Sequence, residues 1–190
     1  MNEAQKTTLL KAACETVRTV VGCKAFELPG SDDAELNEPR GCFVTLKSQN
    51  RLRGCIGQFV SERPLIELVA EMAKASATSD PRFFGDPITA GELEQMDVEI
   101  SVLSPLKRTS DPLSLRLGVD GIYIRRGHVS GCFLPQVATE TGWDTEEFLS
   151  YCCSHKAGLS PDAWKDPDTE VYLLTAEVFG GRFKDILRRG

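Results

Sequence analysis

The chain of 190 residues has little of several features that mark whole classes of protein. No stretch approaches the ~20 consecutive apolar residues that a transmembrane helix needs. Residues 1–22 carry charged side chains throughout, so they lack the uninterrupted apolar core of a secretory signal peptide. The net charge of −6 gives the surface as a whole no attraction for polyanions. We therefore expect a globular cytoplasmic protein that does not contact a membrane.

Metal-binding and hydrolase motifs are also missing. The seven cysteines contain no C-x-x-C pair and the two histidines form no H-x-x-x-H, so we predict no metal site. An odd number of cysteines in a reducing compartment is expected to remain as thiols. There is no G-x-S-x-G, H-E-x-x-H or phosphate-binding Gly-Lys-Ser/Thr sequence. These absences leave the cofactor unknown and argue against a cysteine–histidine protease.

Local patterns predict alternating strands and helices. Apolar residues recur every four positions in residues 4–21, which indicates a helix packed on one side. Residues 42–48 and 51–60 are rich in β-formers and flank Gln49-Asn50, which predicts a hairpin. A helix follows Pro64, and residues 96–104 then alternate as a strand with one polar side.

The same order of elements recurs in the second half of the chain. Residues 121–134 predict another hairpin, a capping box at Asp144 opens a helix, and residues 170–179 form one last strand. A Gly-Cys pair occurs in each hairpin and a Lys-Ala pair late in each helix; these lie at 54–55 and 131–132, and at 74–75 and 156–157. We predict an α+β fold of two unequal lobes built on a duplicated hairpin, helix and strand (42–104 and 119–179). Such lobes usually meet along a groove, and a groove of this kind commonly holds a ligand.

The sequence LRGCIG at 52–57 is the most unusual segment. Gly54 and Gly57 flank Cys55 inside a predicted strand, where glycine weakens pairing and packs nothing, so something must approach the backbone closely. One interpretation is that a ligand reaches Cys55, with Arg53 on the same strand face as an anion-binding fork. The other is a glycine bulge beside a buried, inert cysteine. The sequence leaves both open.

Four further residues have both a functional and a structural interpretation. Glu99 lies on the polar side of its strand, where it is either a solvated charge or an acid/base. Arg82 follows Asp80-Pro81, either in a loop that covers a site or in a turn held by an Asp–Arg pair. Gln136 can present its amide to a ligand or to the backbone. Lys156 can hold an anion or complement the dipole at a helix end.

Several of these motifs together resemble a known family. LRGCIG, DPRF at 80–83, EISVLSPL at 99–106, LPQVA at 134–138, GWD at 142–144 and KAGL at 156–159 occur in the order found in the AMMECR domain, also called AmmeMemoRadiSam system protein A. The resemblance spans roughly residues 42–179. It implies one AMMECR-type domain over residues 1–190, with two unequal lobes and a cleft near LRGCIG. It also implies an association with Memo-type and radical S-adenosylmethionine proteins, but no established reaction.

The leading functional hypothesis is a cleft that binds a small anionic or nucleotide-like ligand. Cys55 would act as a nucleophilic or redox thiol and Glu99 as acid/base, while the remaining positions would bind the ligand: Arg53, Gly54, Gly57, Arg82, Gln136 and Lys156. One alternative is a non-catalytic adaptor that docks partner proteins of the same system. Another is an RNA-binding module that uses the basic C-terminal residues Arg182, Lys184, Arg188 and Arg189.

Overall fold

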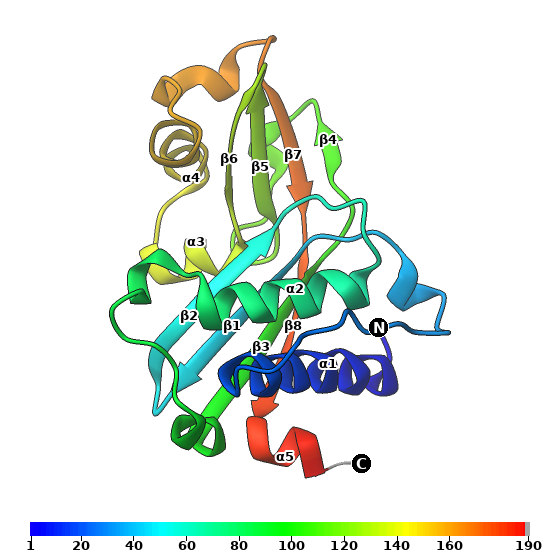
Figure 1. The fold of residues 1–190 in the computed structure, drawn as a ribbon. Helices are drawn as coiled ribbons and strands as arrows, with labels where there is room; N and C mark the ends of the chain where they lie inside the picture. Colours follow the sequence, from blue (N-terminus) through cyan, green and yellow to red (C-terminus); the bar gives the residue numbers. More distant parts are fainter. Residues whose placement is uncertain (189–190) are drawn as a thin grey trace. The chain divides into compact units, whose positions relative to one another are not determined.

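The computed structural model describes residues 1–188, and the chain divides into two compact units. The N-terminal unit comprises Met1–Val102 together with the chain from Glu177 onward. The inserted unit comprises Leu103–Ala176. Each unit contains one four-stranded sheet, as Figure 1 shows. The fold is α+β, as the sequence predicted.

The sheet of the N-terminal unit has the strand order β2-β1-β3-β8, with β1 antiparallel to both β2 and β3. Its elements are α1 (Glu3–Val21), β1 (Cys42–Ser48), β2 (Arg51–Gln58), α2 (Leu65–Thr78), β3 (Met96–Leu103), β8 (Ala176–Arg182) and α5 (Phe183–Arg188). Gln49 and Asn50 both have positive φ, the conformation of a two-residue turn that suits the twist of a hairpin. The predicted hairpin therefore forms with the predicted turn.

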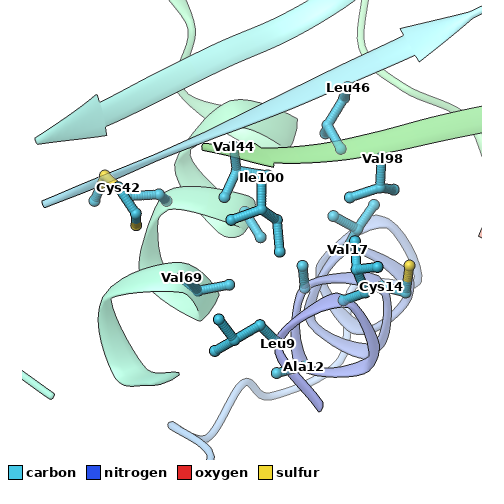
Figure 2. Close-up of a cluster of buried hydrophobic side chains, with 14 of the residues drawn as sticks. Leu9, Ala12, Cys14, Val17, Cys42, Val44, Leu46, Val69, Val98 and Ile100 are labelled. Atoms are coloured by element: carbon cyan, nitrogen blue, oxygen red, sulfur yellow. The ribbon is translucent and has the colours of Figure 1, made fainter. Parts of the chain in front are cut away.

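Helices α1 and α2 cover one face of this sheet and enclose its core. Figure 2 shows Val44 and Ile100 of the strands pointing toward Leu9 of α1 and Val69 of α2. All four side chains are buried. Because side chains alternate along a strand, the residues between them point to the opposite face. We call that opposite face, which carries Thr45 and Glu99, the polar face.

The sheet of the inserted unit has the strand order β4-β7-β5-β6. Its elements are β4 (Lys107–Thr109), β5 (Gly121–Arg126), β6 (Val129–Phe133), α3 (Pro135–Thr141), α4 (Thr145–Tyr151) and β7 (Glu170–Leu174). The capping box at Asp144 is present. The Asp144 carboxylate accepts from the N–H of Glu147, and the Glu147 carboxylate accepts from the N–H of Asp144. A π-helical turn, Cys152–Lys156, continues α4. Short 3₁₀ turns complete the chain at Glu35–Asn37, Pro81–Phe83, Ala90–Gln95, Pro112–Ser114 and Pro161–Lys165.

The two units share one strand arrangement. In each sheet the second hairpin strand, β2 or β6, lies at the edge, and the first hairpin strand, β1 or β5, pairs with it. The strand that follows the helix, β3 or β7, comes next, and a fourth strand completes the sheet. This recurrence of hairpin, helix and strand is the order that the sequence indicated.

One predicted strand is wrong in its extent. Residues 170–179 were expected to form a single strand, but Thr175 separates β7 from β8, and these belong to different sheets. The backbone of Thr175 instead exchanges hydrogen bonds of 2.9 Å with the backbone N–H and the side-chain oxygen of Ser104. Apolar alternation continues through this point, so the pattern alone could not reveal the break.

Candidate functional site

Strand β2, which carries LRGCIG, is an edge strand, and its outer edge is held by an ion pair. The Cys55 N–H donates to Oδ2 of Asp80 at 2.9 Å, and the Cys55 carbonyl accepts from Nη2 of Arg82 at 3.1 Å. Asp80 and Arg82 are joined to each other by bonds of 2.6 and 2.9 Å. The pair thus occupies the hydrogen-bonding positions that a neighbouring strand would otherwise fill.

Asp80 is the buried member of this pair. Its side chain is inaccessible to solvent, whereas that of Arg82 is 53% exposed. The Arg82 guanidinium, together with the N–H groups of Cys55 and Arg82, holds the pKa of the Asp80 carboxyl well below its usual range. The carboxylate is therefore ionised at neutral pH, and it fixes the backbone of Cys55 in place.

Helix α2 presses against the inner side of the same strand. A Cβ added to Gly54 would lie 1.9 Å from the carbonyl oxygen of Ser76, so only glycine fits beneath this helix. The buried Ser76 hydroxyl accepts from the Ile56 N–H at 2.9 Å and donates to the Val44 carbonyl at 2.8 Å, bridging β2 and β1. The close approach at Gly54 is therefore made by a second segment of backbone.

The other glycine of the segment also has a structural partner. A Cβ at Gly57 would lie 2.3 Å from the ring of Phe43 on the adjacent strand. That ring packs edge-to-face against Phe59, with the centroids 4.8 Å apart. Gly57 thus makes room for an aromatic pair beside Cys55, and neither glycine needs a ligand to explain it.

A β-bulge decides which way Cys55 points. Leu46 pairs with Gly54, but the next residue of β1, Lys47, pairs with Leu52, so Arg53 has no partner on β1. The insertion brings Cys55 opposite Thr45 on the polar face. It also separates Arg53 from that face, which corrects the expectation that Arg53 and Cys55 share one side of the strand.

Arg53 is fully occupied by other groups. Its side chain is 3% exposed, and it bonds to the carboxylates of Glu92 and Asp86 at 2.9 and 2.8 Å and to the Pro87 carbonyl. Its planar fork is thus matched to acidic partners of its own unit. This arrangement contradicts the expectation that Arg53 holds an anionic ligand.

Three residues form a row across the polar face, one on each neighbouring strand. Thr45 pairs with Cys55 on one side and with Glu99 on the other. The Thr45 hydroxyl lies 3.2 Å from Cys55 Sγ in hydrogen-bonding geometry. Glu99 is 40% exposed, and Lys47 lies 3.9 Å from its carboxylate. The structure therefore places both predicted catalytic residues, Cys55 and Glu99, on one face of one sheet.

The remaining predicted ligand-binding residues belong to the inserted unit. Gln136 is the second residue of α3, directly after Pro135. Lys156 ends the π-helical turn, is exposed, and holds its Nζ 5.7 Å from the centroid of the Phe133 ring. That cation–π contact gives Lys156 a structural role within its own unit.

Other predictions concern the C-terminus, metals and membranes. Arg182 lies 3.5 Å from Asp97, Lys184 and Arg188 are exposed, and Arg189 falls outside the described residues. In residues 1–188, no group of three or more His, Cys, Asp or Glu side chains is arranged to hold a metal ion. Over the same residues, no helix has the length and apolar character to cross a membrane.

Comparison with known proteins agrees with this architecture. The family model AMMECR1 matches residues 10–179. The chain belongs to the AMMECR1 family. One relative, from Methanothermobacter thermautotrophicus, is 44% identical over 90% of this chain and 92% of its own. Protein MK0488 from Methanopyrus kandleri is 47% identical over 83% and 78%. The crystal structure of the uncharacterized AMMECR1-type protein PH0010 from Pyrococcus horikoshii superposes with a TM-score of 0.77, at 41% identity over 90% of this chain and 89% of that one.

The sequence patterns do not indicate the roles of Thr45 and Ser76, and they indicate only part of the role of Asp80. The Asp80–Arg82 pair was anticipated as a turn clamp, but its bonds to the Cys55 backbone were not. Counting back from the two-residue turn would place Thr45 opposite Gly54, and only the bulge moves it opposite Cys55. A polar residue in the middle of β1 was the one available signal for Thr45.

Proposed function

We propose that the polar face of the N-terminal unit binds a small anionic, nucleotide-like ligand and presents Cys55 to it as a reactive thiol. The observation that carries the proposal is the hydrogen bond from Thr45 to Cys55 Sγ, on a strand whose backbone is fixed by Asp80 and Arg82. The Thr45 hydroxyl donates to the sulfur and so fixes the direction in which Cys55 points. Cys55 is only partly buried, so a reagent can reach it.

Charge and ring contacts support this choice of ligand. Arg82 donates to the Cys55 carbonyl and leaves about half of its side chain exposed, so it places a positive charge that can attract an anion beside Cys55. The Phe43 ring on the neighbouring strand offers a face of the kind on which nucleobases stack. Of the two arginines that the sequence suggested as ligand-binding residues, Arg82 is thus the one we assign to the anion.

The proposed chemistry is attack by the Cys55 thiolate on an electrophilic carbon of the ligand. A sulfur–carbon bond forms, and the bond from that carbon to the leaving group breaks with its electron pair. The thiol proton passes to solvent, and Glu99, which lies two strands away in the same row, delivers a proton to the leaving group through water. This scheme needs no oxidant or metal.

Alkylation by iodoacetamide, read for each cysteine by mass spectrometry, tests the proposal. Cys23 is exposed and serves as the reference thiol, while Cys14 is buried with its pKa raised to about 12 by desolvation and serves as the unreactive control. We expect Cys55 to react faster than Cys23 at neutral pH and adenosine monophosphate to slow Cys55 alone. A Cys55 as inert as Cys14 would contradict the proposal.

A second candidate function is a docking module for the Memo-type or radical S-adenosylmethionine proteins associated with the family. The observation in its favour is a short segment of the inserted unit that exposes three apolar side chains: Leu113, Leu117 and Val119. We expect Leu117→Glu to weaken co-sedimentation with a purified Memo-type protein while leaving Cys55 alkylation unchanged. Unchanged co-sedimentation would remove this candidate.

A further inference from the structure

A cavity in the inserted unit has the volume and charge of a ligand site, and Cys55 is not among the residues that line it. Its volume is about 520 Å³, within the range of small-molecule sites. It is lined by Ser104, Pro105, Lys107, Arg108, Thr109, Ser114, Arg116, Asp120, Leu173, Leu174 and Thr175, all from one unit. Its existence therefore depends on the inserted unit alone.

The lining is cationic in a protein whose net charge is −6. Three of its side chains are positive, Lys107, Arg108 and Arg116, and one is negative, Asp120. Arg116 binds Asp120 through two bonds of 2.9 Å, and this guanidinium holds the pKa of the Asp120 carboxyl below its usual value. One cation of the three is thus neutralised within the cavity, and the lining stays positive.

Lys107 is the unpaired cation of this cavity. Within the described part of the chain, its ammonium makes no ion pair or side-chain hydrogen bond, and the side chain is exposed. Arg108 has one distant partner, Glu170 at 3.5 Å, and is 61% exposed. The two are consecutive residues of β4 and pair with Leu173 and Tyr172, so their side chains project to opposite faces of the sheet. An anion that enters on the side of Leu173 would therefore meet Lys107, whose ammonium has donors to spare.

The larger neighbouring cavity differs in this respect. It has a volume of about 670 Å³ and also contains Arg108, but its other charges are already satisfied. Lys165 bonds to Asp162 at 2.8 Å, and Asp166 pairs with Arg126 at 2.9 Å. Cations that are already ion-paired attract an anion only weakly, so the smaller cavity is the better anion site.

Polar and apolar groups on the other walls define the remaining chemistry. Within residues 1–188 the Thr175 hydroxyl makes no hydrogen bond, so it is available to a ligand. The hydroxyls of Ser104 and Ser114 already donate to backbone carbonyls. Pro105 and Leu173 contribute apolar surface beside Lys107. The cavity thus combines an anion-binding end with an apolar wall.

We propose that this cavity binds a small phosphate ester, with the phosphate held by Lys107 and the organic part against Pro105 and Leu173. The hydroxyl of Thr175 supplies a further donor to a phosphate oxygen. A phosphate offers more acceptor oxygens than a carboxylate, which matches separate donors on several elements. The site is independent of the proposed chemistry at Cys55.

Calorimetric titration of the full chain with phenyl phosphate at low salt tests the proposal. Benzoate carries the same ring on a carboxylate, and inorganic phosphate carries the charge without the ring. We expect saturable binding of phenyl phosphate that is tighter than that of either comparison ligand. Equal or tighter binding of benzoate would overturn the assignment to phosphate, and the absence of saturable binding would overturn the site.

Variants locate the binding. Lys107→Gln should weaken phenyl phosphate about tenfold, as expected for loss of one charged hydrogen bond, and Lys107→Arg should retain affinity. Lys184→Gln, which removes an exposed cation of the other unit, is the matched control and should change nothing. Cys55→Ser should also leave binding unchanged, so this site and the thiol site succeed or fail separately. Unaltered affinity in Lys107→Gln, with the fold intact by thermal unfolding, would refute the proposal.

Discussion

Each unit places a glycine and a cysteine at the equivalent position of its own sheet, yet the two cysteines have different surroundings. Gly54 in β2 and Gly131 in β6 each lie beneath the end of a helix; an added Cβ would come 1.9 Å from Ser76 O and 2.4 Å from Ala157 N. The next residue in each strand, Cys55 or Cys132, points to the opposite face. The glycine is therefore part of the shared scaffold.

The cysteines differ in what surrounds them. Cys132 pairs with Tyr123 on the neighbouring strand, and burial raises the pKa of its thiol to about 12. Cys55 instead has the Thr45 hydroxyl at its sulfur and side-chain partners for its backbone. In residues 1–188, no side chain hydrogen-bonds to the backbone of Cys132. The same scaffold thus carries a thiol whose pKa is raised by burial in one unit and a thiol that accepts a hydrogen bond from Thr45 in the other.

Substituting the scaffold glycines should have the largest effect. Gly54→Ala would drive a Cβ into the backbone of α2, and we expect it to lower the free energy of unfolding by about 3 kcal/mol or more. Gly131→Ala should cost less, because its nearest contact is longer. Urea unfolding measures both, with Gly30→Ala as control, since no atom lies within 4 Å of a Cβ there. Equal losses would show that the helix ends fit the two sheets equally tightly.

The Asp80–Arg82 pair at the edge of β2 should make the stability of the fold depend on pH. The ionised Asp80 has its pKa lowered in the folded state, so it stabilises the fold above the ordinary Asp value of about 4, and this stabilisation is lost as the pH falls. Asp80→Asn should cost about 3 kcal/mol at pH 7, as expected for a broken buried pair. The difference in free energy of unfolding between the unaltered protein and Asp80→Asn should then become smaller as the pH falls. Thermal unfolding from pH 7 to pH 2 measures this difference. A constant gap would mean that the carboxylate charge contributes nothing.

Removing the hydroxyl that bridges β1 and β2 should have an intermediate effect. Ser76→Ala leaves the Ile56 N–H and the Val44 carbonyl without their shared partner, so we expect a loss of about 1–3 kcal/mol. Urea unfolding gives the loss, and amide hydrogen exchange at Ile56 should speed up. The exposed Ser79→Ala, near the end of the same helix, is the control. Unchanged exchange at Ile56 would show that the bridge is dispensable.

Substitution of Thr45 should cause the smallest change in stability, but it should clearly change the alkylation rate of Cys55. Thr45→Val keeps the shape of a half-buried strand residue but removes the donor to Cys55 Sγ. We expect slower alkylation of Cys55, no change at Cys23, and a loss of stability of about 1 kcal/mol. If Cys55 were alkylated at the same rate in Thr45→Val as in the unaltered protein, the Thr45 hydroxyl would not be the cause of any difference in reactivity between Cys55 and Cys132.

Much of the local structure followed from the sequence. The hairpin turn at Gln49-Asn50, the strand from Met96 and the capping box at Asp144 all rest on neighbouring residues, and all form as predicted. The break at Thr175 and the three-residue strand β4 were missed, because strand pairing across the chain defines them. Local patterns report local geometry, whereas partners far along the chain leave no periodic trace.

The sequence by itself determined the order of elements, the alternation that puts Glu99 on a polar face, and the need for close approach at Gly54. Only the tertiary structure decided what approaches Gly54 and which way its neighbours point. The bulge at Arg53 turns that side chain to Asp86 and Glu92 and brings Cys55 opposite Thr45. The physical reason is that side chains alternate along a strand with a period of two, so one inserted residue exchanges the faces. Long-range packing against α2 and the ion pairs with Asp86 and Glu92 fix where the insertion occurs.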